Sequence, residues 1–314
     1  MKINKTTLGC LFCLFLTALM GVYAQSQDPL EGRWNLTISQ EGKDLPAWLE
    51  ISHSGTSTLI GRFTYAFGSA RPIAEVRKLG GKFYFSIPPQ WEPGAANMEF
   101  EAALNGARLE GTMVYVDGNT YTWSGERTPT LPYIDNPSWG KTKKLFNGKN
   151  LEGWKAMGEN QWQVKDGILV SDKSGANLVS EEKFTDFKLH VEFRYPEGSN
   201  SGLYLRGRYE VQIADNAGLE PSSLLFGGIY GLLSPNEMVA KKANEWQTFD
   251  IALIGRRVTV VANGETIINE QNILGMTGGA LDNHESEPGP IMIQGDHGAV
   301  EFRSIEITPM LPKR

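Results

Sequence analysis

The sequence NSGLYLRGRYEVQI, residues 200–213, contains two short runs in which apolar and polar residues alternate, separated by a glycine and an arginine. A period of two is typical of a β-strand that buries one face, and a two-residue break between such runs is typical of a hairpin. We therefore predict a β-hairpin with one apolar and one polar face. The polar face is either a site for chemistry or an outer face in water. It carries Tyr204, Arg206, Glu210 and Gln212.

The first half of the chain shows the same alternation in shorter runs, without a convincing helix between them. Turn signals such as Gly80-Gly81 and Asn105-Gly106 separate the runs at the spacing of an all-β domain. We predict a small antiparallel β-barrel or sandwich over residues 28–130. Its expected strands are 32–38, 47–51, 57–65, 82–87, 98–104, 108–115 and 119–125.

Four aromatic residues of this half lie outside any catalytic or metal-binding pattern. They are Trp48, Trp91, Tyr115 and Trp123. We favour packing in the core, because aromatic side chains bury a large area in small β domains. The alternative is a platform on which a sugar ring stacks.

The second half follows a proline-rich linker at residues 131–140 and also consists of strands and turns. Asp166-Gly167 and Asn263-Gly264 are predicted hairpin turns. We predict a β-sandwich of two curved sheets over residues 141–312, so that the whole chain is all-β. Long loops at 227–243 and 275–287 are expected to wall a cleft. The longer expected strands are 187–194, 247–254, 257–262, 290–294 and 300–307.

The chain opens with two lysines and an apolar run that ends in Val22-Tyr23-Ala24. This pattern is typical of a secretory signal peptide, so we expect residues 1–24 to be removed and the protein to be exported, to the periplasm or as an extracellular protein. The alternatives are a membrane anchor, for which the run is short, and a lipoprotein attached at Cys10. Both cysteines lie in this segment, which excludes disulfide and thiolate chemistry in the mature chain.

The charge balance narrows the class of ligand. Over 314 residues the net charge is −6, with 40% hydrophobic and 21% charged residues. Nucleic acids and anionic membranes are bound through basic patches. A neutral or sugar-like ligand fits this composition better, and we expect neither a nucleic-acid partner nor a membrane span.

A series of short motifs occupies the second half. In chain order they are Phe146-Asn147-Gly148-Lys149, Gly153-Trp154, Asp166-Gly167, Asn200-Ser201-Gly202, Tyr209-Glu210-Val211-Gln212-Ile213, Glu245-Trp246, Asn263-Gly264, Gly289-Pro290-Ile291 and Gln294-Gly295-Asp296-His297-Gly298. This order and spacing, from Lys144 to Pro309, resembles the 3-keto-disaccharide hydrolase domain family. The resemblance implies a concanavalin-like β-sandwich, or jelly roll. The first domain lies outside it.

The resemblance also implies an activity. The family acts on glycosides whose C3 hydroxyl a separate oxidoreductase has oxidised to a ketone. The ketone acidifies the hydrogen on C2, so a base can remove it and the resulting enolate can expel the C1 substituent. The outcome is hydrolysis if water then adds in the same site, and a lyase reaction if the enone leaves. The alternative is a non-catalytic carbohydrate-binding module, since lectins share this fold.

Residues on the polar strand face and in the family motifs supply the expected site. We predict Glu210 and His297 as the catalytic residues, one of which removes the C2 proton. In the alternative reading, these two hold a divalent metal ion that polarises the ketone. The acidic residues do not form the tight cluster of an ordinary glucanase. The predicted substrate-binding residues are Arg206, Gln212, Tyr204, Asp215, Asn200, Gln294 and Asp296.

Overall fold

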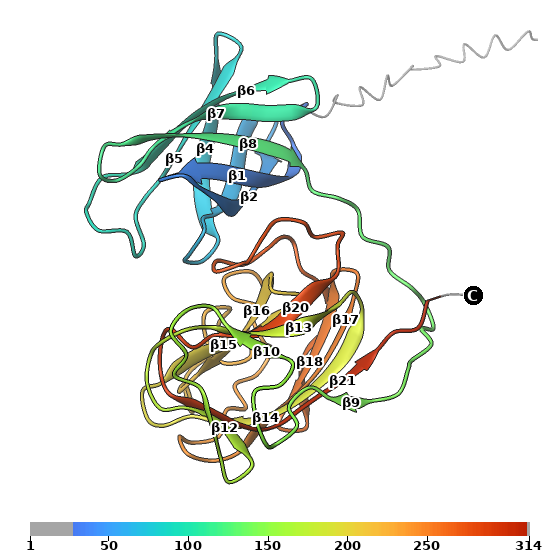
Figure 1. Ribbon diagram of the computed structural model, residues 1–314. Helices are drawn as coiled ribbons and strands as arrows, with labels where there is room; N and C mark the ends of the chain where they lie inside the picture. Colours follow the sequence, from blue (N-terminus) through green and yellow to red (C-terminus); the bar gives the residue numbers. More distant parts are fainter. Residues whose placement is uncertain (1–27, 313–314) are drawn as a thin grey trace, which may run out of the picture.

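The computed structural model describes residues 28–312, which form two all-β units joined by an extended segment (Figure 1). Strands, turns and loops account for this range, as the alternation predicted. The predicted signal peptide, residues 1–24, lies outside the described residues. Between residues 28 and 312 the chain forms no helix with the length and hydropathy needed to cross a membrane.

The first unit is a closed antiparallel barrel, which confirms the predicted small β domain. The strands follow one another around the barrel, and β1 closes it against β8. They are β1 (Gly32–Gln40), β2 (Lys43–Ser54), β3 (Thr58–Thr64), β4 (Arg71–Leu79), β5 (Lys82–Ile87), β6 (Met98–Asn105), β7 (Arg108–Val114) and β8 (Thr120–Arg127). The alternation missed β4, because its buried residues Ile73 and Val76 are three positions apart and the β3–β4 register shifts.

The four aromatic residues of the first unit have different environments. Trp123 lies in the barrel core, as predicted, and Tyr115 packs against that core from a half-buried position. Trp48 is also fully buried, but it packs against the second unit. Its indole lies so close to Gly275 that a side chain at that position would overlap it. Trp91 is 68% exposed, so the prediction that it packs in the core is wrong.

The second unit is a β-sandwich, as predicted. Its smaller sheet has the order β10 (Trp154–Ala156), β13 (Leu178–Phe184), β20 (Gly289–Ile293), β15 (Asn200–Leu205) and β16 (Tyr209–Ala214). Its larger sheet has the order β11 (Gln163–Lys165), β12 (Ile168–Ser171), β21 (Val300–Pro309), β14 (Phe187–Arg194), β17 (Gln247–Ile254), β18 (Arg257–Ala262) and β19 (Glu265–Asn272), and β9 (Lys143–Lys144) pairs with β21. The hairpin turns at Asp166-Gly167 and Asn263-Gly264 are present, with positive φ at each residue.

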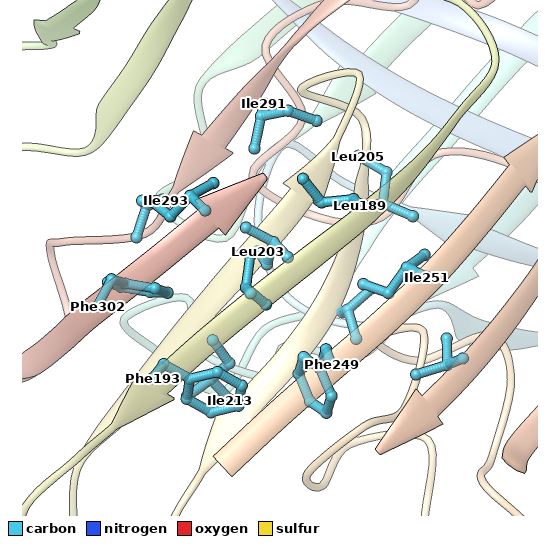
Figure 2. Packing of buried hydrophobic residues seen from close by; sticks show 14 of the residues in the cluster. Leu189, Phe193, Leu203, Leu205, Ile213, Phe249, Ile251, Ile291, Ile293 and Phe302 are labelled. Carbon is cyan, nitrogen blue, oxygen red and sulfur yellow. The ribbon is translucent and has the colours of Figure 1, made fainter. Parts of the chain in front are cut away.

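Apolar side chains of both sheets fill the space between them (Figure 2). Leu189 and Phe193 of β14 and Phe249 of β17 pack in one cluster with Leu203 of β15 and Ile293 of β20, and each is 1% exposed or less. Because side chains alternate along a strand, burial of this face directs the intervening residues of β15, β16 and β20 to the opposite face. A slip of one residue would bury the polar set, so the core determines which residues reach the site.

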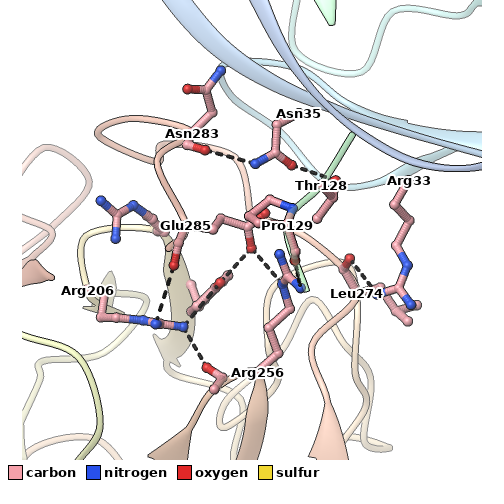
Figure 3. Close-up of polar contacts among 12 residues, drawn as sticks. Arg33, Asn35, Thr128, Pro129, Arg206, Arg256, Leu274, Asn283 and Glu285 are labelled. Atoms are coloured by element: carbon pink, nitrogen blue, oxygen red, sulfur yellow. Dashed lines mark hydrogen bonds and ion pairs between the residues drawn. The ribbon is translucent and has the colours of Figure 1, made fainter. Parts of the chain in front are cut away.

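The barrel docks on the sandwich through the loop between β19 and β20, residues 273–288 (Figure 1). Asn35 of the barrel donates from Nδ2 to the carbonyl oxygen of Asn283 at 2.8 Å (Figure 3). Arg256 of the sandwich donates from Nη1 to the carbonyl oxygen of Pro129, in the segment that joins the units, at 2.8 Å. A side chain of each unit thus binds a main-chain oxygen of the other unit or of the joining segment, and these bonds help to fix the relative position of the two units.

Candidate active site

Gly202 of β15 lies at the centre of the polar face of the smaller sheet. On one side its partner in register is Gln212 of β16, and on the other the main-chain N of Gln294 donates to its carbonyl oxygen at 2.8 Å. The side chain of Glu210 bends across this glycine, because a Cβ added at Gly202 would overlap Oε1 of Glu210. The missing side chain thus lets the carboxyl lie between the two glutamines.

Glu210 is 3% exposed, and this burial changes its chemistry. Burial raises the pKa of Glu210 to about 8, against the opposing effects of a hydrogen bond with Tyr204 and the positive charge of His297. The negative charge of Asp296 raises the pKa further. A carboxyl with this pKa is mostly protonated at neutral pH, and once ionised it is a stronger base than a surface carboxylate. Shifts of this kind are typical of active sites.

Tyr204 and the loop at residues 275–279 enclose Glu210. The Tyr204 hydroxyl hydrogen-bonds with Glu210 and donates to the carbonyl oxygen of Gly278 at 3.0 Å. Burial, and then the charge of Glu210, raise the pKa of Tyr204 well above its usual value, so the phenol stays protonated. The main-chain N of Glu210 donates to Oγ1 of Thr277 at 3.0 Å.

His297 and Asp296 follow β20 and act on Glu210 electrostatically. Nδ1 of His297 lies 2.6 Å from Oδ1 of Asp296, and both side chains are about half exposed. The hydrogen bond with Asp296 raises the pKa of His297 despite the opposing effect of burial, and the charges of Asp296 and Glu210 raise it further. Nε2 is therefore the ring nitrogen left to exchange a proton with a ligand.

Three side-chain amide oxygens in the site have no hydrogen-bond partner among residues 28–312. They are Oδ1 of Asn200, Oε1 of Gln212 and Oε1 of Gln294, and all three are enclosed by the protein. Buried polar atoms are nearly always hydrogen-bonded in folded proteins, so three orphans on neighbouring strands indicate a ligand. As acceptors, they require donors such as hydroxyl groups.

Tyr230 is a site residue that the sequence patterns did not indicate. Its main-chain N donates to the carbonyl oxygen of Glu210 at 3.0 Å, and its hydroxyl accepts a hydrogen bond from the indole of Trp91. Burial, and then the charge of Glu210, raise the pKa of the Tyr230 phenol. Tyr230 lies in the expected cleft-wall loop at 227–243, where irregular backbone gives no periodicity to mark the side chains that face inward.

Two predicted substrate-binding residues make other contacts. Arg206 follows the end of β15 in a left-handed turn, with φ of 54°, which removes its side chain from the strand face. Its guanidinium donates to the carbonyl oxygen of Gly255 at 2.6 Å and lies at the junction shown in Figure 3, so the prediction that it shares a face with Glu210 is wrong. Asp215 accepts a hydrogen bond from the main-chain N of Gly198 at 2.9 Å, which ties together the two ends of the hairpin.

The metal alternative lacks ligands. Residues 28–312 contain no group of three or more His, Cys, Asp or Glu side chains placed to hold a metal ion. Glu210 and His297 would supply two protein ligands, fewer than structural and catalytic sites for tightly bound zinc use.

Comparisons with known proteins concern the second unit. Residues 141–308 match the 3-keto-alpha-glucoside-1,2-lyase-like domain. A 3-keto-disaccharide hydrolase of Bacteroides thetaiotaomicron is 30% identical over 93 residues, which cover 24% of this chain and 32% of that protein, so the match spans less than a third of the relative's length. Crystal structures of two candidate glycosyl hydrolases of Parabacteroides distasonis are similar, with TM-scores of 0.46 and 0.42 and identities of 27% and 26%. The similarity covers 56% and 54% of this chain, and 92% and 98% of those chains.

Proposed function

Because the chain belongs to the 3-keto-alpha-glucoside-1,2-lyase-like domain family, we propose that it cleaves the glycosidic bond of 3-keto-glycosides, including 3-keto-disaccharides. A separate oxidoreductase makes the ketone. The observation that carries the proposal is the buried carboxyl of Glu210 among three unpaired amide oxygens. The hydroxyl groups of a sugar are donors that such oxygens can accept from. From the pattern of residues 1–24 we also propose export, which intact-mass analysis would test by a mature chain that starts at Gln25.

The proposed reaction begins at C2 of the oxidised sugar. Ionised Glu210 takes the C2 proton, and the electrons of that C–H bond form the enolate of the C3 ketone. The ketone re-forms as the enolate electrons make the C1–C2 double bond and the C1–O bond breaks. His297 gives its proton to the leaving oxygen. The products are an unsaturated 3-ketone and a free alcohol or sugar, and addition of water across the double bond returns the 3-keto sugar.

The remaining residues of the site bind and orient the sugar. The amide oxygens of Asn200, Gln212 and Gln294 accept hydrogen bonds from ring hydroxyls. The Tyr230 hydroxyl accepts from Trp91 and donates its own proton to the enolate oxygen, where the negative charge develops. The raised pKa of Tyr230 keeps that proton in place at neutral pH.

A carbohydrate-binding module would not require a buried carboxyl with a raised pKa at Glu210. A carboxyl whose pKa is near 8 when folded lowers the stability of the fold at neutral pH relative to one that titrates normally. Sugar hydroxyls bind equally well to an amide at the same position. Proton abstraction from carbon, in contrast, uses a base with a raised pKa, which favours catalysis over simple binding.

The test uses an aryl 3-keto-glucoside and its unoxidised parent. We expect the full-length protein to release the aryl alcohol from the ketone alone, because the C2 hydrogen of the parent is not acidic. In heavy water the 3-keto sugar formed by water addition should carry deuterium at C2, with unlabelled 3-keto sugar incubated without enzyme as the control for spontaneous exchange. Release from both substrates, or complete retention of the original C2 hydrogen, would contradict the proposal.

A further inference from the structure

We propose that the barrel provides a second part of the substrate site: an aromatic platform at Trp91 for a ring attached to C1. The inference rests on the proposed function, which defines the substrate. It gives the barrel, which lies outside the family match, a role in selecting substrates whose leaving group is a sugar or an aryl ring.

Trp91 lies in the loop between β5 and β6, residues 88–97. Tyr230 connects it to β16, the strand that carries Glu210. Its indole N–H hydrogen-bonds to the Tyr230 hydroxyl. Tyr230 in turn donates from its main-chain N to the carbonyl oxygen of Glu210 at 3.0 Å. The Trp91 side chain is nevertheless 68% exposed. One edge of the ring is therefore fixed at the site while its surface is open to a ligand.

A buried ion pair holds the loop that presents Trp91. The carboxylate of Glu92 accepts hydrogen bonds from the main-chain N of Gln90 at 2.7 Å and of Trp91 at 3.1 Å. It also pairs with Arg71, whose Nη2 lies 3.0 Å from Oε1. Although burial acts to raise it, these bonds and Arg71 lower the pKa of Glu92 overall. The exposed ring is thus preorganised, and a ligand that binds it does not have to order the loop.

Close main-chain contacts fix this part of the barrel against the site. The loop between β3 and β4 carries Gly68, at which an added Cβ would lie 3.4 Å from the Trp91 ring. The carbonyl oxygen of Gly68 lies so close to Gly278 that a Cβ there would overlap it. Beside it, the main-chain N of Gly279 donates to the carbonyl oxygen of Ala66 at 2.8 Å. The platform cannot move relative to the site without breaking these contacts.

The class of ligand follows from which part of the substrate each part of the site would bind. Glu210 and the three amide oxygens account for the oxidised ring, so the group on C1 must extend beyond them. An exposed indole offers a flat apolar surface, and sugar and aryl rings have flat apolar faces that displace water from it. The methyl group of a methyl glycoside, on the C1 oxygen, is too small to cover the indole surface.

The experiment measures binding without turnover. In the Glu210→Gln background, calorimetry compares three 3-keto-glucosides, which carry a methyl group, an aryl ring or a glucose on the C1 oxygen. We expect Trp91→Ala to raise Kd for the ring-bearing ligands about tenfold and to leave Kd for the methyl ligand unchanged. Trp91→Phe keeps a ring but loses the N–H, and should retain most of the affinity. Leu79→Ala, at a 75% exposed residue of the barrel, is the matched control.

Two results would overturn the platform. One is equal affinity of the ring-bearing ligands for the background protein and for its Trp91→Ala variant, which includes the case in which neither binds. The other is an equal loss for the methyl ligand, because Trp91 would then act through Tyr230. Failure of the proposed function is seen separately, as an absence of aryl release by the unmutated protein.

Discussion

Two glutamates are buried near the same hairpin, and their surroundings differ. Glu285 is fully buried and paired: Nε of Arg256 donates to it at 2.8 Å and the Tyr209 hydroxyl at 2.5 Å (Figure 3). Glu210 is almost as deeply buried, but the cation that acts on it, His297, is hydrogen-bonded to another carboxylate. One carboxyl therefore has its charge matched by close partners, and the other does not.

The difference separates the structural use of the carboxyl at Glu285 from the catalytic use that we propose for Glu210. A buried pair is costly to break, because the remaining partner keeps an uncompensated charge. A buried carboxyl without a close cation keeps its proton to higher pH and is suited to exchanging that proton with a substrate. Substitution of Glu210 should therefore lower kcat, whereas substitution of Glu285 should lower the free energy of unfolding.

The largest expected effect is on turnover at Glu210. Glu210→Gln keeps the size of the side chain but removes the base, so we expect kcat on an aryl 3-keto-glucoside to fall by a factor of about 10² to 10⁴. Circular dichroism and thermal melting should show a folded protein. If the variant retains a tenth or more of the parent's kcat, Glu210 is not the base.

The complementary effect is on stability at Glu285. Glu285→Gln leaves Arg256 with an unmatched charge, so the free energy of unfolding should fall by about 3–5 kcal/mol, measured by denaturant titration. The folded variant should retain the parent's kcat. A variant as stable as the parent but deficient in turnover would mean that the two glutamates are not divided in this way.

A pH series sharpens the comparison. The pKa of Glu210 is about 8 in the folded protein, above its value in the unfolded chain, so the folded state binds this proton more tightly. Its stabilising contribution is complete at pH below 4.5 and is lost as the pH rises toward 8. Relative to the parent, Glu210→Gln should therefore gain about 1.4 kcal/mol per pH unit across this range. A difference in unfolding free energy that is constant between pH 5 and 8 would contradict the raised pKa.

The smallest expected effect concerns the glycine beneath Glu210. In Gly202→Ala the new methyl group overlaps Oε1 and displaces the carboxyl, so we expect a loss of about tenfold in kcat with little change in KM. The same change in the Glu210→Gln background should add little, because the base is already absent. Independent, additive losses would show that Gly202 acts by some route other than Glu210.

Period-two alternation was sufficient to predict the hairpin and the face shared by Tyr204, Glu210 and Gln212, because the buried core allows one register. It could not show that the strand before Gln294 and His297 pairs with β15, since pairing between distant strands leaves no local pattern. Those two residues were identified through the order of the family motifs.

The wrong placement of Arg206, and the failure to connect Tyr230 and Trp91 with the site, also have physical causes. Arg206 lies one residue past the strand, and its left-handed backbone depends on a turn that the alternation does not encode. Tyr230 reaches Glu210 because an irregular loop adds to the edge of β16, and Trp91 reaches Tyr230 because the barrel docks on that side. Both are tertiary events, whereas sequence periodicity reports secondary structure.

The loop at residues 275–279 has a consequence for how such a protein can evolve. Through Thr277 and Gly278 it contacts Glu210 and Tyr204, and through the next residue, Gly279, it binds the barrel. A lineage that exchanged the barrel for another domain by recombination would disturb the enclosure of its own base. In this chain the barrel therefore supports the enclosure of the proposed base, although it supplies no acid or base itself.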